Sequence, residues 1–290
     1  MASVSLWCYI QDLMYPRLLT TPYLTLHTFG VFLAIAYLSA LWWLLRSGRR
    51  EGEDPDRLVS LGLWCIVGAI IGAKALMILR SLPEYLANPA DFLSLSTLQS
   101  AGDFYGGFIG ALMASAWFFS RHKEMSVWHT SDLCAPAIAL GQAIGRIGCF
   151  MAGDDYGRLA SVPWAVTFTD PDAAQIGGAP LGVPLHPVQI YESLLCLAFF
   201  ILLVWWLRRK RFDGEIILGY TFFYGIARFL LEYLRGDADR GFVFGGALST
   251  SQFIAVILVF VSAALYAMRH KSRGATHRDG AQKATKQRNS

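Results

Sequence analysis

The chain has 290 residues, 54% of them hydrophobic and 16% charged, with a formal net charge of +4 at pH 7. This composition is typical of an integral membrane protein and excludes an ordinary soluble domain. The five cysteines show no metal-ligand spacing and the basic residues lie in short loops and the tail, so neither a metal site nor a nucleic-acid-binding surface is indicated.

Seven apolar segments approach the ~20 residues that a helix needs to cross a bilayer. In chain order they are 23–45, 58–79, 104–120, 126–151, 187–207, 215–234 and 248–268. We therefore predict an all-α, polytopic membrane protein in which residues 1–268 form one domain of seven transmembrane helices. Residues 152–186, rich in Gly, Pro and Asp, are expected to form a small periplasmic head loop, and residues 269–290 a basic cytoplasmic tail.

The distribution of basic residues predicts the orientation. The loops after the first, third and fifth segments and the tail are rich in Lys and Arg, whereas residues 82–103 contain none and residues 152–186 contain only Arg158. Basic loops tend to stay in the cytoplasm. We therefore expect a multi-pass protein with its N-terminus outside and its C-terminus in the cytoplasm.

The end of the fourth segment carries Arg146 between glycines, and Asp154, Asp155 and Arg158 follow within twelve residues. An arginine at membrane depth costs several kcal/mol unless it has a partner or water, so it marks a functional site by default. The alternative is an arginine at a helix end whose charged head reaches the interface. The spacing alone leaves both interpretations open.

The sixth segment carries Tyr224, Arg228, Glu232 and Arg235, spaced by four, four and three residues. This spacing places all four on one face of a helix, which must point to a bundle interior or a wet cavity. The alternative is an internal Arg228–Glu232 pair that only neutralises itself.

Two further segments combine glycine or polar residues with an apolar run. Tyr105 precedes Gly106 and Gly110, a small-xxx-small pair that favours plain helix packing, while Tyr105 is either an interfacial anchor or a cavity residue. Three polar side chains open the fifth segment: His186, Gln189 and Glu192. For these three, a polar helix end wetted by the interface is favoured over a site.

The arginines and carboxylates gather toward the outer side of the predicted bundle. Guanidinium forks match phosphate oxygens in a bidentate manner, so a basic cavity there suits a phospholipid headgroup. An ion or proton pathway would instead spread carboxylates and histidines through the full depth of the membrane. The pattern therefore favours lipid chemistry over transport.

A series of short motifs follows a fixed order over residues 20–268. They are His27-Thr28-Phe29-Gly30, Gly72-Ala73-Lys74, Tyr105-Gly106-Gly107-Phe108-Ile109-Gly110, residues 145–158, Pro163-Trp164-Ala165, His186-Pro187-Val188-Gln189-Ile190-Tyr191-Glu192, Tyr224 with Arg228, Glu232 and Arg235, and Ser251-Gln252. Each motif is weak alone. The ordered series, with the predicted topology, resembles the bacterial phosphatidylglycerol–prolipoprotein diacylglyceryl transferases.

This resemblance implies a seven-span enzyme of the bacterial inner membrane. It would transfer a diacylglyceryl group from phosphatidylglycerol to the lipobox cysteine thiol of a prolipoprotein signal peptide, forming a thioether and releasing glycerol phosphate. Neither a metal nor another cofactor is implied. Arg146 and Arg228 would grip the headgroup phosphate, and Glu232 and Asp154 would orient them.

The resemblance also implies two sets of site residues. The catalytic set is Tyr105, Arg146, Arg228 and Glu232. The substrate-binding set is Arg146, Cys149, Asp154, Gly157, Arg158, Tyr224, Arg235, His27 and Lys74.

Several positions depart from the family pattern. The family usually has histidine at Tyr105, asparagine at Cys149 and Ala152, glutamate at Asp154 and arginine at Lys74. The histidine is a proposed base for the substrate thiol. The reference pKa of a thiol is ~8.5 and that of tyrosine ~10, so an unperturbed tyrosine is neutral and a poorer base than histidine. Either a nearby arginine lowers the pKa of Tyr105, or the basic cavity stabilises the substrate thiolate directly.

Two rival hypotheses remain beside the transferase. One is a divergent paralogue that keeps the lipid site but acts on another acceptor. The other is a non-enzymatic membrane protein that binds or transports phospholipid. Turnover separates an enzyme from a binder, because only the enzyme consumes phosphatidylglycerol and releases glycerol phosphate.

Overall fold

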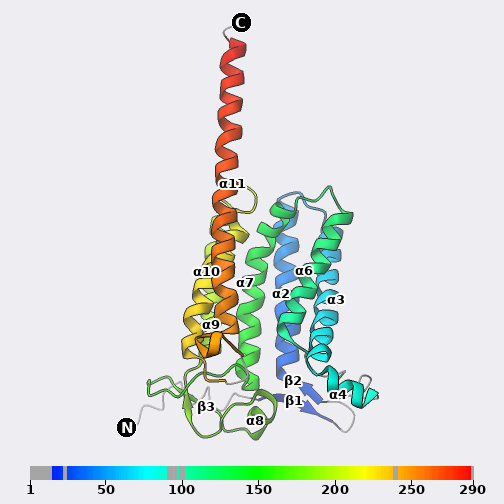
Figure 1. The fold of residues 1–290 in the computed structure, drawn as a ribbon, viewed down its shortest axis with the longest axis vertical. Coiled ribbons are helices and arrows are strands. Elements are labelled where there is room, and N and C mark those ends of the chain that lie inside the picture. The colour runs from blue at the N-terminus through cyan, green and yellow to red at the C-terminus, as the bar shows by residue number, and fades with distance from the viewer. Residues whose placement is uncertain are drawn as a thin grey trace. The chain divides into compact units, whose positions relative to one another are not determined.

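The computed structural model describes residues 15–21, 25–89, 94, 97, 102–237 and 241–288, with side chains of the last helix described as far as Lys271. Long helices dominate these residues (Figure 1). They are α2 (Thr28–Arg50), α3 (Pro55–Arg80), α6 (Phe104–Arg121), α7 (Val127–Ala152), α9 (Val188–Leu207), α10 (Glu215–Leu231) and α11 (Thr250–Arg288). The predicted class, a helical polytopic membrane protein, is confirmed.

Six of the helices in the described residues are long and apolar enough to cross a membrane. The exception among the seven predicted segments is α6, which is long enough at 18 residues but less apolar, because its sequence includes glycines, serines and Arg121. A count of seven spans therefore stays a prediction.

The first helix begins five residues later than the sequence predicts. Thr25–His27 forms strand β2, which pairs with β1 (Arg17–Thr20) in an antiparallel hairpin. The backbone N–H of Thr28 then donates to the carbonyl of Pro16 at 3.0 Å, so the hairpin holds the first residue of α2. Strand β2 runs directly into α2, and a hydropathy window long enough to detect a membrane span does not resolve three residues at its edge.

The chain divides into two compact units: a large unit, Met1–Trp43 with Ser131–Ser290, and a small unit, Leu44–Thr130. In the small unit α3 packs on α6, and the predicted packing role of the two glycines is confirmed. A Cβ atom at Gly106 or Gly110 would overlap the carbonyl oxygen of Gly72 or Gly68. A short helix, α4 (Leu82–Ala87), follows α3.

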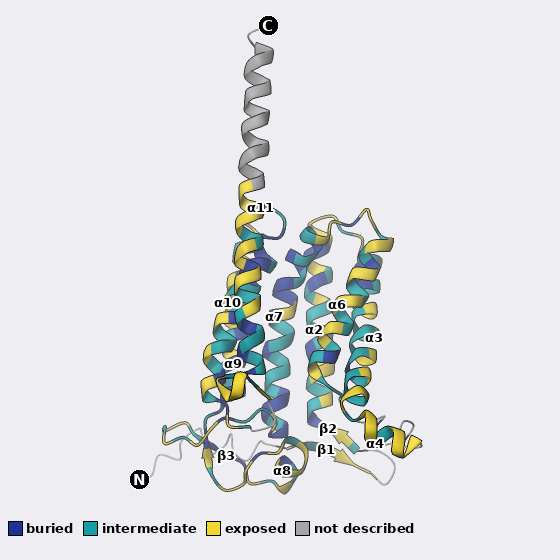
Figure 2. Cartoon of the chain, viewed as in Figure 1, coloured by how far each residue is buried: buried dark blue, intermediate teal, exposed yellow. Residues whose placement is uncertain are grey.

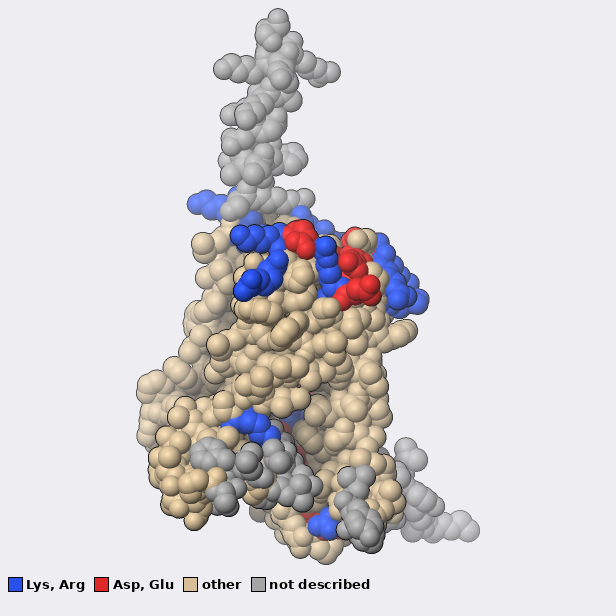
Figure 3. All heavy atoms as spheres, turned by 90° about the vertical axis from the view of Figure 1, so that its right-hand side faces the viewer, with Lys and Arg blue, Asp and Glu red and all other residues tan. Residues whose placement is uncertain are grey.

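Charged side chains of the small unit gather at the turns between its helices. Arg57 at the start of α3 pairs with Glu124 in the α6–α7 turn, with 2.6 Å between Nη1 and Oε1. On the face shown in Figure 3, uncharged residues form a broad band next to these charged turns. The band is what a lipid-facing helix surface requires.

In the large unit, the carboxylate of Asp132 fixes the start of α10. It is fully buried and accepts hydrogen bonds from the backbone N–H groups of Gly214, Ile216 and Ile217 at 2.8, 3.0 and 3.0 Å. An anion at a helix N-terminus satisfies donors that have no partner within the helix. Buried residues occur along α7, which carries this aspartate (Figure 2).

The segment between α7 and α9 has a small core of its own. It contains the antiparallel pair β3 (Val166–Thr167) and β4 (Pro184–Leu185), and helix α8 (Pro171–Gly177). Its buried apolar residues are Phe150, Val166, Phe168, Ala173, Ala179 and Leu185. Between α10 and α11 the chain forms η2 (Glu232–Leu234), η3 (Phe244–Gly246) and the pair β5 (Phe242–Val243) and β6 (Leu248–Ser249).

Candidate active site

One end of the large unit brings together the C-terminus of α7, the loop after it, the N-terminus of α9, and the C-terminus of α10 with η2. These elements supply three arginines and four carboxylates joined by ion pairs. We call this set the arginine cluster: Arg146, Arg228, Arg235, Asp155, Glu192, Glu232 and Asp237. Such charges are tolerated inside a helical bundle only when they are paired.

Glu192 lies at the centre of the cluster, on the first turns of α9. It is 2% exposed, and its Oε2 lies 3.1 Å from Nε of Arg146 and 3.9 Å from Nη1 of Arg228. Its other oxygen accepts a hydrogen bond from the hydroxyl of Tyr224 at 2.8 Å. One carboxylate thus joins side chains from α7, α9 and α10.

Arg228 has two partners on one side of its guanidinium group. Its Nη2 lies 3.1 Å from Oε2 of Glu232 and donates to Oγ of Ser251 at 3.4 Å. The Arg228–Glu232 pair of the alternative interpretation therefore forms, but Arg228 also contacts Ser251 and Glu192. Its Nη1 is buried and donates no hydrogen bond to any described residue. Buried donors without an acceptor are rare in native proteins, so this nitrogen calls for an explanation.

Asp155 lies between two of the arginines. One of its oxygens accepts from Nη1 of Arg146 and the other from Nη2 of Arg235. Arg235 also donates from Nε and Nη2 to Asp237, at 2.9 and 2.6 Å. Burial opposes ionisation of Asp155, but the charges of Arg146 and Arg235 outweigh it and lower the pKa of its carboxyl to about 2.

Asp154, directly before, differs in its surroundings. The residue is exposed, but its carboxyl group lies next to Cys149 and Asp155, and its Oδ1 accepts from the backbone N–H of Asp155 at 2.9 Å. Desolvation and the charge of Asp155 raise the pKa of Asp154 to about 6. The two neighbouring carboxyl groups therefore differ in pKa: arginines keep Asp155 ionised, whereas Asp154 is easier to protonate.

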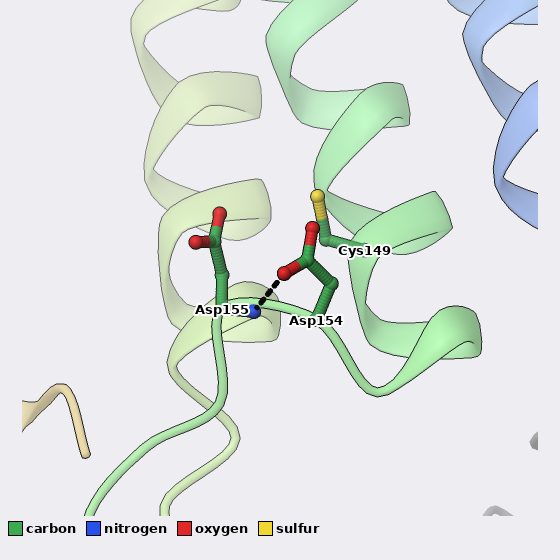
Figure 4. Close-up of side chains that lie close together, drawn as sticks. All are labelled: Cys149, Asp154 and Asp155. Atoms are coloured by element: carbon green, nitrogen blue, oxygen red, sulfur yellow. Dashed lines mark hydrogen bonds between the residues drawn. The ribbon is translucent and has the colours of Figure 1, made fainter. Parts of the chain in front are cut away.

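Figure 4 shows Asp154, Asp155 and Cys149 close together, with one potential ligand atom from each within 4.8 Å of the others. This is a spacing at which a metal ion can be held. However, Nη1 of Arg146 lies 3.8 Å from Sγ of Cys149 and also pairs with Asp155. A fixed positive charge therefore already neutralises this group, and we propose no metal there.

A short backbone ladder fixes the loop after α7 against the segment after η2. Gly157 pairs with Arg235 in an antiparallel bridge, flanked by hydrogen bonds from Arg158 N–H to Leu234 carbonyl at 2.8 Å and from Gly236 N–H to Tyr156 carbonyl at 3.0 Å. A Cβ atom at Gly157 would overlap the carbonyl oxygen of His186. Only glycine therefore fits here.

The prediction that one helix face carries Tyr224, Arg228, Glu232 and Arg235 is wrong for the last of them. α10 ends at Leu231, and Arg235 has extended backbone angles, φ −74° and ψ 144°. It reaches the cluster through the backbone ladder instead. Gly236 supports this path, because a Cβ atom there would lie 2.6 Å from the carbonyl oxygen of Gly157.

Two predicted substrate-binding residues of the large unit lie apart from the ion pairs. The side chain of Arg158 is exposed and forms no ion pair with a described carboxylate. His27 is exposed at the end of β2. The remaining predicted residues of this unit, Cys149, Asp154, Gly157 and Tyr224, lie in or next to the cluster.

The other two predicted residues belong to the small unit. Tyr105 is half-buried in the first turn of α6, where its backbone N–H donates to Oδ1 of Asp103 at 2.9 Å. Nζ of Lys74 donates to the carbonyl of Thr97 at 2.5 Å. Their predicted roles are not tested by these contacts.

The sequence did not assign Asp155, Glu192 or Asp237 to the site. Glu192 was visible as an acidic residue at the start of an apolar run, for which a wetted helix end was favoured. That preference is wrong, because the side chain is buried among arginines. No pattern indicated that Asp155 rather than Asp154 turns toward the guanidinium groups.

Chemically, the cluster can bind an oxyanion. Fixed guanidinium groups stabilise negative charge that develops on a phosphate, and they do so best where water is excluded. The carboxylates hold the arginines in place and balance their charge in the buried setting. The unsatisfied Nη1 of Arg228 is a donor available to such a ligand.

Comparison with known proteins agrees with this chemistry. The family model for prolipoprotein diacylglyceryl transferase matches residues 16–268. A phosphatidylglycerol–prolipoprotein diacylglyceryl transferase of Clostridium tetani is 34% identical over 82% of this chain and 91% of its own. Proteins of the same name from Solidesulfovibrio magneticus and Pseudomonas aeruginosa are each 33% identical, over 87% and 83% of this chain and 94% and 88% of their own.

Proposed function

This chain belongs to the prolipoprotein diacylglyceryl transferase family, and we propose that its arginine cluster binds the phosphatidylglycerol headgroup for the transfer. The chain is a transferase that moves a diacylglyceryl group from phosphatidylglycerol to a prolipoprotein. We propose the lipobox cysteine of the signal peptide as the acceptor and the bilayer as the source of the lipid.

The observation that carries the headgroup site is the buried Nη1 of Arg228, which has no hydrogen-bond acceptor among the described residues. A phosphate oxygen would satisfy it. Arg146 would bind the same phosphate, since Glu192 holds both guanidinium groups by contacts of 3.1 and 3.9 Å. Glu232 would orient Arg228 from its other side.

The transfer forms a carbon–sulfur bond and breaks a carbon–oxygen bond. The substrate thiolate attacks the carbon of the diacylglyceryl unit that carries the phosphate, the bond between that carbon and the phosphate oxygen breaks, and glycerol phosphate leaves with the bonding electrons. The thiol proton is taken up by a base or by the departing phosphate. Negative charge grows on that phosphate, so fixed arginines lower the barrier.

The family resemblance supports further roles in this chain. We propose Tyr105 as a catalytic residue near the thiol, and substrate-binding roles for Cys149, Asp154, Gly157, Arg158, Tyr224, Arg235, His27 and Lys74. No metal or other cofactor enters this scheme.

The test is genetic rescue. We expect this gene to restore growth and lipoprotein maturation in a bacterium depleted of its own diacylglyceryl transferase. A folded, membrane-inserted protein that fails to rescue, yet consumes phosphatidylglycerol, would favour a paralogue with another acceptor. One that binds the lipid without consuming it would favour a non-enzymatic role.

Tyr105 offers a prediction of its own. Tyr105→His should keep or raise the rate of transfer, because an imidazole titrates closer to a thiol and so makes a better-matched base. Tyr105→Phe should lower the rate through loss of the hydroxyl. Initial rates with a lipobox peptide measure both effects. If Tyr105→Phe matches the parent while Tyr105→His is inactive, the hydroxyl is not catalytic.

We propose that the protein lies in the bacterial inner membrane with its N-terminus outside and its C-terminus in the cytoplasm. Within the large unit, α9 begins at the arginine cluster and ends at the basic run Arg208-Arg209-Lys210-Arg211, about 30 Å away for its 20 residues. Basic loops favour the cytoplasm, so the cluster would lie toward the outer leaflet.

Reporter fusions test this orientation. Alkaline phosphatase, which is active only outside the cytoplasm, should be active when inserted within residues 160–180 and inactive when fused after residue 290. The reverse pattern would contradict both the topology and the outer position of the site.

A further inference from the structure

We infer that Asp155 is a positioning residue that holds Arg146 and Arg235 together as one phosphate-binding pair. Asp155 thus has the role that the family resemblance assigns to Asp154, which is to orient the arginines. The inference rests on the proposed function and adds to it a second arginine pair, with the carboxylate that aligns it.

The contacts of Asp155 are the first argument. Its two oxygens have different partners, Arg146 on one side and Arg235 on the other. Arg146 belongs to α7, whereas Arg235 follows η2, so this carboxylate joins guanidinium groups from distant parts of the chain. Asp237 holds the other edge of Arg235 at 2.9 and 2.6 Å. The plane of that guanidinium group is therefore fixed by two carboxylates.

The backbone is the second argument. Asp155 has φ +56°, in the left-handed region that residues other than glycine rarely adopt, and Gly153 before it has φ +76°. Asp154 supports this turn, because its Oδ1 accepts the N–H of Asp155 at 2.9 Å. A conformation of this kind persists only where the surroundings enforce it, and such residues concentrate at functional sites.

The contrast with Asp154 is the third argument. That residue is exposed and its side chain forms no ion pair with a described arginine. The two adjacent aspartates thus have separate roles: Asp154 shapes the turn, and Asp155 aligns the arginines. Figure 4 shows the two carboxylates on the same loop, with the hydrogen bond that supports the turn.

A pair of matched substitutions tests this division. Asp155→Asn replaces one accepting oxygen with an NH2 group, which then meets an arginine donor, so the bridge is lost. Asp154→Asn keeps the oxygen that accepts the Asp155 N–H and removes no arginine contact. The two variants are identical in chemistry and adjacent in sequence.

We expect Asp155→Asn to lower kcat for transfer from phosphatidylglycerol to a lipobox peptide by about 100-fold, with a smaller change in KM. A misplacement of about 1 Å in a group that acts in the transition state has an effect of this size. Asp154→Asn should lose at least tenfold less kcat than Asp155→Asn, because it removes no arginine contact, and Asp155→Glu should recover at least a tenth of the parent kcat, because it keeps the charge. Equal losses in the two asparagine variants, or a parental rate in Asp155→Asn, overturn the inference.

If Asp155→Asn does not accumulate as folded protein, Asp155→Glu provides the test. A loss of kcat in Asp155→Glu as large as that in Arg146→Ala would then overturn the positioning role. Failure of this inference differs from failure of the proposed function. In the first case Arg146→Ala loses most of its activity while the two asparagine variants behave alike, and in the second case Arg146→Ala keeps its activity.

Discussion

Arg146→Ala and Arg228→Ala are each expected to lower kcat/KM for diacylglyceryl transfer by about two to three orders of magnitude. Removal of one fixed donor from a site that stabilises an oxyanion has an effect of this size. Both side chains are mostly buried, at 17% and 13% exposed, so the donors act where water is largely excluded. The measurement is the rate at which a lipobox peptide gains the diacylglyceryl group in detergent or liposomes.

Arg208→Ala is the control for these variants. This arginine is exposed at the other end of α9, so its loss should leave the rate near that of the parent. The rates of Arg146→Lys and Arg228→Lys should lie between those of the parent and the alanine variants, because lysine keeps the charge but lacks the planar guanidinium group. Retained transfer in both alanine variants would mean that the headgroup is bound elsewhere.

Glu192→Gln is the second change with a large expected effect, here on stability as well as activity. Glu192 contacts Arg146, Arg228 and Tyr224 while only 2% exposed. Removal of its charge leaves two guanidinium groups short of a counter-ion, and breaking a buried pair in this way costs about 3–5 kcal/mol. We expect the free energy of unfolding in detergent to fall by that amount, and transfer to be lost.

Two further variants separate charge from hydrogen bonding at this position. Tyr224→Phe removes only the hydroxyl that donates to Glu192, so it should lower the free energy of unfolding by about 1 kcal/mol. Glu232→Gln should be milder than Glu192→Gln, because Glu192 contacts two arginines and the hydroxyl of Tyr224. If Glu192→Gln is as stable as Tyr224→Phe, the central role of Glu192 is refuted.

The helices and their order could be predicted from hydropathy, because burial in lipid demands long apolar runs whatever the tertiary packing. The exact ends of the helices and the short strands beside them could not be predicted in this way. The β-hairpin before α2 forms by pairing between β1 and β2, and α10 ends at Leu231 because the following residues pair with the loop after α7. These boundaries depend on contacts between segments distant in sequence.

The arginines of the site could be predicted because a charge in an apolar segment is conspicuous. Their partners could not be predicted with the same certainty. Which of two adjacent aspartates faces Arg146 depends on the backbone of this turn, where Asp155 has a left-handed conformation that the sequence does not indicate. Similarly, Glu192 looks like a polar helix end until α7 and α10 are placed beside it.

The most direct test of the central claim is turnover by the purified full-length protein with radiolabelled phosphatidylglycerol and a lipobox peptide. We predict that the peptide gains one diacylglyceryl group through a thioether at its cysteine. Glycerol phosphate should be released in equal amount, and both products should form at least about 100-fold more slowly with the Arg146→Ala protein. Lipid that binds to the folded protein without releasing glycerol phosphate, or a rate unchanged by Arg146→Ala, would contradict a headgroup site in the arginine cluster.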